Sequence, residues 1–182
     1  MRPAQYAVVA YVTNPVGEFV EELRRETYPE HGHLPAHVTI LPPRYVDATE
    51  EGALETLEKL CREVQPFDIE MGEVANFLPI TPTVFIQVAH GAYRIRELHD
   101  KLNSGPLHCD ESWPYMPHLT IVKVANEEQT RHAFDIAVKA WAHYRGPRKV
   151  RIDRLTFVRE GDNAHWIDLA PVPLGGSLTP AR

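Results

Sequence analysis

Two short segments of the chain repeat one arrangement of residues that can transfer protons. The segment LPAHVTILPP contains His37 and Thr39, and the segment YMPHLTIVKV contains His118 and Thr120. In each, a proline comes shortly before a histidine, which is followed by an apolar residue, a threonine and an isoleucine. Composition alone would produce about 0.1 such apolar-flanked motifs in a chain of this length. Two copies therefore indicate a common role.

Each motif lies in an apolar run that is typical of a β-strand. Alternate side chains of a strand point to opposite faces, so His37 and Thr39 share one face while Val38 and Ile40 share the other. The second motif alternates in the same way. If the two strands meet, two imidazoles and two hydroxyls line one groove, while the apolar residues enter a core.

This set of groups suits the hydrolysis of a phosphodiester. Displacement at phosphorus requires a proton to leave the attacking oxygen and another to reach the leaving oxygen on the opposite side. Histidine, with an ordinary pKa near 6.5, serves in either role near neutral pH, and each transfer typically contributes about 10²–10⁴-fold. Threonine hydroxyls can donate hydrogen bonds to the non-bridging oxygens. The scheme requires no metal and no cofactor.

The elements that must position these groups occur twice along the chain, in the order strand, helix, His-Thr strand, helix, strand. Strands are expected at 6–13, 37–41, 67–77, 83–90, 118–124, 149–158 and 164–170. Helices are expected after Asn14-Pro15, after Thr49, through Ile95, Leu98 and Leu102, and after Asn126.

This duplication predicts an α+β fold with two pseudo-symmetric lobes, each a small, mainly antiparallel sheet backed by helices, and a central cleft. We expect one domain over residues 1–171. Its lobes cover roughly 1–80 and 81–171, with exchange of strands between them allowed. A flexible tail is expected over 172–182, where the sequence is rich in proline and glycine.

Composition limits the partners. With 43% hydrophobic residues, the 182-residue chain can form a core. Its net charge of −6 argues against a long nucleic-acid groove and leaves room for a small phosphate ligand or one RNA end. No apolar run approaches the roughly 18–20 residues of a membrane span, and no signal peptide is evident. We therefore expect a cytoplasmic protein without a membrane partner and with two reduced thiols, Cys61 and Cys109. The pattern indicates no oligomeric state.

The two motifs, their separation and the duplicated layout resemble the two-histidine (2H) phosphoesterase superfamily, and within it the bacterial branch named for 2′-5′ RNA ligase activity. The resemblance implies a catalytic set of His37, Thr39, His118 and Thr120. It also implies metal-independent hydrolysis of 2′,3′-cyclic phosphates on RNA ends or nucleotides, or cleavage or joining of 2′-5′ linkages. The expected partner is a nucleotide or RNA terminus of that kind. By the same resemblance, His118 acts as the base toward water and His37 as the acid.

The resemblance also suggests residues that contact the substrate. The family often has an aromatic–Pro lead-in to the second motif and a basic residue five positions after its histidine. Alternation turns that basic residue away from the histidine, so its role requires a bend in the strand. An aromatic residue that commonly follows the first motif is replaced here by LPPRY. The substrate-binding candidates are Tyr11, Arg44, Tyr115 and Lys123, with Tyr45 and Trp113 as further aromatic positions.

Two other readings of the sequence stay open. The segment HGHLPAH brings His31, His33 and His37 close together, which suggests a zinc site and a metal-dependent hydrolase, although Pro35 interrupts any helix there. Alternatively, the same groove binds a nucleotide or RNA end without turning it over. The basic segment 145–159 is a further candidate for guiding an anionic substrate.

Overall fold

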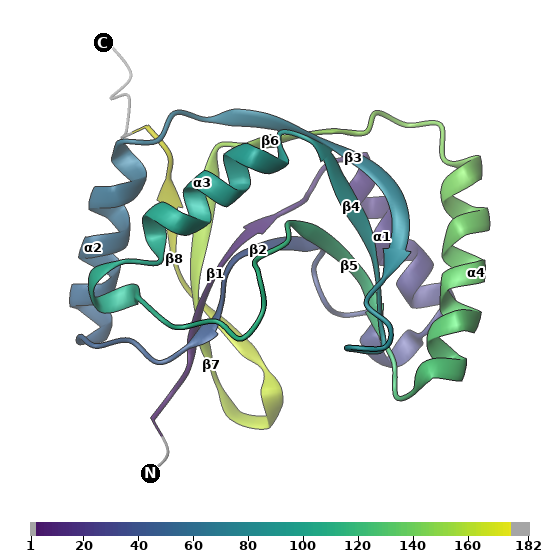
Figure 1. Ribbon diagram of the computed structural model, residues 1–182, viewed down its shortest axis with the longest axis horizontal. Coiled ribbons are helices and arrows are strands. Elements are labelled where there is room, and N and C mark those ends of the chain that lie inside the picture. The colour runs from purple at the N-terminus through teal and green to yellow at the C-terminus, as the bar shows by residue number, and fades with distance from the viewer. Residues whose placement is uncertain (1–2, 176–182) are drawn as a thin grey trace.

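The computed structural model describes residues 3–175, which fold into a strongly curled sheet flanked by helices (Figure 1). Among these residues none of the helices is long and apolar enough to cross a membrane. The strands are β1 (Tyr6–Tyr11), β2 (His37–Arg44), β3 (Phe67–Asn76), β4 (Thr83–His90), β5 (His118–Lys123), β6 (Lys149–Ile152), β7 (Arg154–Glu160) and β8 (Trp166–Pro173). The α-helices are α1 (Pro15–Thr27), α2 (Glu50–Arg62), α3 (Ala92–Leu102) and α4 (Glu127–His143).

The strands form one eight-stranded antiparallel sheet in the order β6-β3-β4-β5-β2-β1-β7-β8. The expectation of a separate sheet in each lobe was therefore wrong, although the α+β class is confirmed. The two halves of the sheet also mix the two halves of the chain, because β3 joins β4 and β5, whereas β7 and β8 join β1 and β2. The two motif strands, β5 and β2, meet at the centre.

The helices cover one face of this sheet in two pairs. Helices α2 and α3 lie on one side of the molecule, and α1 and α4 lie on the other (Figure 1). Three of them begin where the sequence indicates, since the side chains of Asn14, Thr49 and Asn126 accept backbone N–H groups of the first helical turn. The main core lies between helices and sheet, and it includes Val38 and Leu119 of the motif strands.

Strand β2 continues through Pro42 and Pro43, although the sequence predicted that it would stop there. Two register shifts between β1 and β2 absorb the irregularity. On its other edge β2 pairs with β5 only at Val38, so this edge requires no N–H from either proline.

The segment predicted as one strand over 149–158 is two strands, because the chain breaks at Asp153. β6 pairs with β3 near one end of the sheet, and β7 pairs with β1 and β8 in the other half. The hairpin of β7 and β8 is present as predicted. A tail was expected from 172, but β8 reaches Pro173 and the side chains of Val172 and Leu174 are buried in the core. Residues 176–182 lie outside the described chain.

Candidate active site

His37 and His118 lie at the starts of the two central strands, on the face opposite the helices. The antiparallel register of Val38 with Leu119 puts Thr39 across from His118, and it puts His37 across from the threonine of the second motif. The two imidazoles are therefore diagonal neighbours, positions that lie roughly 7–8 Å apart in a regular ladder. The flanking apolar residues of both motifs are buried, while the histidines and threonines are half-buried. The alternation expected from the sequence thus brings all four groups together.

Both imidazoles are held in the same way. His37 Nδ1 lies 2.9 Å from the carbonyl oxygen of Pro35, and His118 Nδ1 lies 2.7 Å from that of Met116. A carbonyl can only accept, so Nδ1 carries the proton in both rings. In the neutral ring, Nε2 is then unprotonated and available as a base, and after protonation the same atom is available as an acid.

Burial lowers the pKa of both histidines below the ordinary value of 6.5. The hydrogen bonds to the Pro35 and Met116 carbonyls oppose this effect. For His37, the positive charge of Arg24 lowers the pKa further. For His118, the charge of His37 does so. Because a proton on His37 disfavours one on His118, the two rings titrate as a coupled pair.

A buried arginine of α1 binds backbone carbonyls of the second motif strand, β5. Arg24 Nε donates to the Ile121 carbonyl at 2.8 Å, and its Nη2 donates to the Thr120 carbonyl at 3.0 Å. Its Nη1 donates to the Leu34 carbonyl, in the loop that leads to His37. One guanidinium thus connects both motifs. Within residues 3–175 it bonds to carbonyls alone and forms no ion pair, and Glu21 is the nearby carboxylate.

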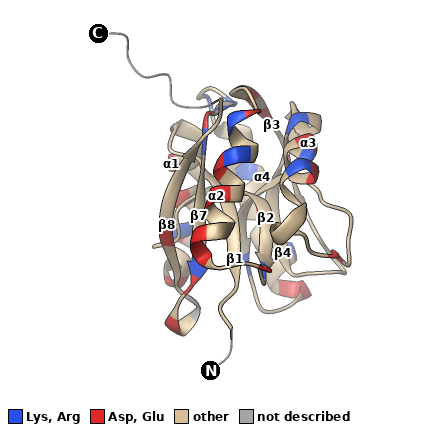
Figure 2. Ribbon diagram, turned by 90° about the vertical axis from the view of Figure 1, so that its left-hand side faces the viewer, with Lys and Arg blue, Asp and Glu red and all other residues tan. Residues whose placement is uncertain are grey.

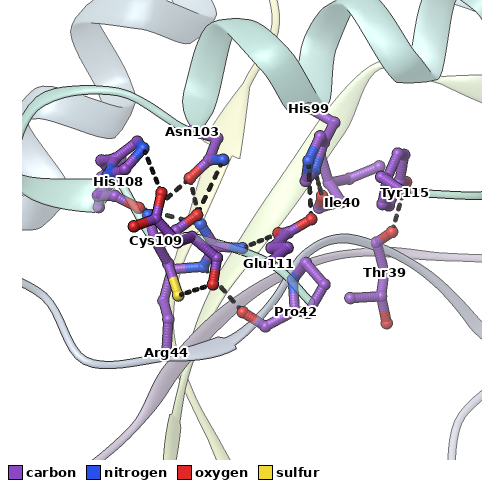
Figure 3. A network of polar contacts seen from close by, with 12 residues as sticks. Thr39, Ile40, Pro42, Arg44, His99, Asn103, His108, Cys109, Glu111 and Tyr115 are labelled. Carbon is purple, nitrogen blue, oxygen red and sulfur yellow. Dashed lines mark hydrogen bonds and ion pairs between the residues drawn. The ribbon is translucent and has the colours of Figure 1, made fainter. Parts of the chain in front are cut away.

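The first motif strand is held by a different group from α3 and the segment before β5. The Tyr115 hydroxyl donates to the Thr39 carbonyl at 2.6 Å, and His99 Nδ1 donates to the Ile40 carbonyl at 2.8 Å (Figure 3). The two rings stack, with centroids 3.9 Å apart. These donors replace a β-ladder that exists between β2 and β5 only at Val38.

A half-buried carboxylate connects this group to Arg44. Glu111 faces His99 Nε2 at 3.2 Å with one oxygen and Arg44 Nη2 at 2.5 Å with the other (Figure 3). Both ring nitrogens of His99 thus face acceptors, Nδ1 the Ile40 carbonyl and Nε2 the Glu111 carboxylate. Arg44 and Tyr115, both candidates for substrate binding, thus have their polar groups engaged inside the protein, where they support β2.

An open cavity of about 510 Å³ borders His37. Its floor is a small apolar cluster on the site face of the sheet, formed by Ala7, Val9 and Val158. The rim is polar and aromatic, and it comprises Tyr11, His33, His165, Trp166 and Asp168. The cavity does not extend to His118, whose ring instead contacts Phe77 and Phe85 edge-on, with centroids 4.9 Å and 5.2 Å away.

Tyr11 is the substrate-binding candidate that lines this cavity. It pairs with His37 across β1 and β2, and the two rings meet edge-on with centroids 6.4 Å apart. Its hydroxyl donates to Asp168 Oδ1 at 2.5 Å. Burial and then this hydrogen bond raise the pKa of Tyr11, so the hydroxyl stays protonated.

The remaining candidates lie further from the histidines. A register shift against β4, with Ile121 and Val122 both buried, supplies the bend that Lys123 needs, and its side chain is exposed. Lys123 nevertheless lies five strand positions from His118, a distance of about 16 Å, so it can meet only a neighbouring phosphate. Tyr45 and Trp113 are exposed and do not line the cavity.

Neither the histidine cluster nor the basic segment forms the site that the sequence suggested. Among the described residues, no three potential ligands from His, Cys, Asp and Glu gather as a metal site requires. The basic segment 145–159 is divided between β6 and β7. Two of its arginines form ion pairs with acidic residues of other elements, Arg151 with Asp68 and Arg159 with Glu50. On the face in Figure 2, acidic and basic residues are intermingled.

Several site residues were missed by the sequence analysis. Arg24 sits among other charged residues of a helix, and Trp166 and Asp168 follow the last turn of the chain. Their neighbours in sequence carry no motif, and only the pairing of β8 with β7 and of β7 with β1 brings them to the site. The sequence suggests a role for His33 as a metal ligand, whereas in the structure His33 lines the cavity.

Comparison with known proteins gives one family. The sequence model of the family described as the 2′-5′ RNA ligase superfamily matches residues 12–164. A protein of Oceanobacillus iheyensis, whose name carries a provisional phosphoesterase assignment, is 28% identical over 122 residues, which cover 65% of this chain and 70% of that protein. A similarly named protein of Halalkalibacterium halodurans is 24% identical over 173 residues, covering 93% of this chain and 97% of that protein.

Solved structures share the fold. Apo LigT of E. coli superposes with a TM-score of 0.65 at 17% identity, over 97% of this chain and 100% of that chain. LigT in complex with 3′-AMP superposes with a TM-score of 0.61 at 14% identity, over 96% of this chain and 100% of that chain. The curled sheet with its helix pairs is thus a LigT-like fold.

Proposed function

We propose a function from the family of this chain, which belongs to the 2′-5′ RNA ligase superfamily of two-histidine phosphoesterases. The proposed reaction is hydrolysis of 2′,3′-cyclic phosphates or 2′-5′ linkages. Its substrates are nucleotides or RNA ends. The observation that carries the proposal is the pair of imidazoles: each donates Nδ1–H to a backbone carbonyl, and both lie on one face of adjacent strands. Two Nε2 atoms are thereby left for the two proton transfers of a displacement at phosphorus.

In hydrolysis, His118 Nε2 takes a proton from water, and protonated His37 Nε2 gives one to the leaving ribose oxygen. The asymmetry of the site supports these roles. The cavity beside His37 has room for the organic part of the leaving group, whereas aromatic rings pack against His118, which then needs to meet only water. Because a proton on His37 disfavours one on His118, the two rings lose their protons in separate steps, and the singly protonated state that acid–base catalysis requires occupies the pH range between those steps.

Groups on the two motif strands and on helix α1 stabilise the negative charge of the phosphate. The hydroxyls of Thr39 and Thr120 share the face of the imidazoles and donate to the non-bridging oxygens. Arg24 adds a positive charge in the low-dielectric region beneath β5, at a position where no carboxylate of the described chain neutralises it directly. The site thus stabilises an anion without presenting a basic surface to long nucleic acids.

The test is a product assay on short RNAs that end in a 2′,3′-cyclic phosphate, run with a strong chelator present. We expect turnover to a single monophosphate regioisomer and a bell-shaped pH profile with one limb for each imidazole. His37→Ala and His118→Ala should each lose at least about a hundredfold in kcat, the lower range of one proton transfer.

His132→Ala is the matched control, because His132 is exposed on α4, on the helix-covered side of the molecule. It should keep the wild-type rate. Near-normal turnover by either site variant refutes the two-proton scheme. Loss of activity on chelation, with recovery on adding Zn²⁺, would support a metal-dependent hydrolase instead. Tight binding of the RNA end without turnover would indicate a binding module.

A further inference from the structure

We propose that the cavity beside His37 binds the nucleobase of the nucleotide whose ribose oxygen is the leaving group, and that Asp168 makes it selective for bases with adjacent N–H donors, guanine above all. This inference rests on the proposed function and specifies the substrate of the same site. It follows from three features of the cavity: its apolar floor, its charge and its place on one side of the paired histidines.

The floor suits a flat, largely apolar group. Ala7, Val9 and Val158 are all buried, yet they belong to the face of the sheet that the helices do not cover. They form an apolar cluster separate from the main core, which is the usual lining of a small-molecule site. Trp166, which is 40% exposed, adds a large aromatic surface at the rim. Aromatic side chains beside an apolar surface are the common way to hold a base.

The charge of the lining excludes a phosphate from this part of the site. Of the described residues that line the cavity, Asp168 carries the one full formal charge, and none is Lys or Arg. A second phosphate there would meet the Asp168 carboxylate and no lysine or arginine, and the proton that His37 carries in the reaction goes to the leaving oxygen. The occupant is therefore the uncharged part of the substrate, which in a nucleotide is the base and its sugar.

Asp168 gives the cavity its donor preference. Tyr11 donates its hydroxyl to Oδ1 and fixes the carboxylate in place, while Oδ2 makes no hydrogen bond with a residue of the described chain. An ionised carboxylate only accepts hydrogen bonds. Guanine presents the adjacent N1–H and N2–H donors that match it. Adenine and cytosine each present one amino group, and uracil presents one N–H between two carbonyl oxygens that a carboxylate repels. The expected order is guanine first and uracil last.

The position of the cavity links the base to the leaving oxygen. Tyr11 is the cross-strand neighbour of His37, and both residues line the cavity. A base held there attaches to the sugar whose oxygen His37 protonates. Selectivity should therefore appear on the leaving side of the reaction.

The experiment compares the four 2′,3′-cyclic mononucleotides as substrates of the wild type, Asp168→Asn and Asp110→Asn. Asparagine at 168 can still accept from Tyr11 through Oδ1, while its amide offers donors where the carboxylate offered an acceptor. We expect KM for the guanine substrate to rise at least about tenfold, the lower end of what one hydrogen bond to a charged group contributes. KM for the uracil substrate should stay the same or fall, with kcat within threefold. Asp110 is fully exposed and outside the cavity, so Asp110→Asn should leave the base preference unchanged.

Binding is measured separately, by calorimetric titration of guanosine 3′-monophosphate and uridine 3′-monophosphate. Hydrolysis of all four substrates with equal KM, or a guanine preference that survives Asp168→Asn, overturns the base subsite and leaves the proposed function standing. If neither the cyclic substrates nor a 2′-5′-linked dinucleotide is hydrolysed, the proposed function fails. The subsite then stands only if the guanine nucleotide binds at least tenfold tighter than the uracil nucleotide and loses that advantage in Asp168→Asn. Equal or undetectable binding overturns it.

Discussion

Arg24→Met removes the guanidinium that connects the two motifs while keeping a side chain of similar length. In the wild type this group donates to the carbonyls of Leu34, Thr120 and Ile121. Arg24 is 4% exposed, so water cannot replace these donors without opening the structure. The variant leaves three carbonyls without their donor and separates the loop before His37 from strand β5.

The magnitude follows from these contacts. Hydrogen bonds from a charged donor contribute about 1.5–3 kcal/mol each, so three contribute roughly 5–9 kcal/mol. Removing a buried cation returns part of this, because its desolvation costs several kcal/mol. The net decrease in the free energy of unfolding should be about 3–5 kcal/mol. A domain of ordinary stability, about 5–15 kcal/mol, survives this loss in a weakened form.

Urea titration followed by circular dichroism measures the effect. With a slope of about 2 kcal/mol per molar urea, the midpoint should fall by about 2 M. Arg25→Met is the matched control, since Arg25 is the next residue of α1 and is exposed. Its midpoint should stay within a few tenths of a molar of the wild type.

Arg24→Lys separates charge from geometry. Lysine keeps the positive charge but cannot reach three carbonyls with one nitrogen. Burial is the main cause of the low pKa of His37, and the charge of Arg24 lowers it further. The activity limb that belongs to His37 should therefore move to higher pH in Arg24→Met and less in Arg24→Lys. A midpoint change below 0.5 M in Arg24→Met, with an unchanged pH profile, refutes the role of Arg24 as the link between the motifs.

Three other predictions follow from the buried groups. Because burial lowers the pKa of His37 and His118 below 6.5, the unfolded chain binds these protons at a higher pH than the folded protein does. The stability that the two neutral rings contribute is therefore complete above pH 6.5 and is lost as the pH falls through the folded pKa values. Urea midpoints measured between pH 8 and 5 should decrease accordingly, and the decrease should be smaller in His118→Asn. Tyr115→Phe keeps the stacking on His99 but removes the donor to the Thr39 carbonyl, so the free energy of unfolding should fall by about 1–3 kcal/mol; an unchanged urea midpoint contradicts this. Burial raises the pKa of Cys61 to about 12, so a thiol reagent should label Cys109 in the native protein and Cys61 only after unfolding, and labelling of both at equal rates contradicts the buried position.

Local patterns were sufficient for the elements and for the chemistry of the motifs. Alternation within HVTIL and HLTIV determines which side chains face the groove and which enter the core, and the structure confirms this separation. Capping residues such as Asn14 and Thr49 determine where helices begin, because their side chains satisfy N–H groups within the same turn. These properties depend on neighbours within a few residues, so they can be read directly from the chain.

The partners of each element depended on the whole fold. The break at Asp153 sends β6 and β7 to different halves of the sheet, and no residue near it indicates which strands they join. Arg44 lies seven residues after His37, yet its guanidinium is buried against Glu111, sixty-seven positions away in the chain.

The sequence by itself thus determined two strands that each present a histidine and a threonine on one face. The tertiary structure decided that these strands are neighbours, that Arg24 and Tyr115 hold their carbonyls, and that the cavity opens beside His37 alone. Strand pairing and cavity shape are sums over contacts between distant segments, and no local periodicity encodes which of those contacts the folded chain will make.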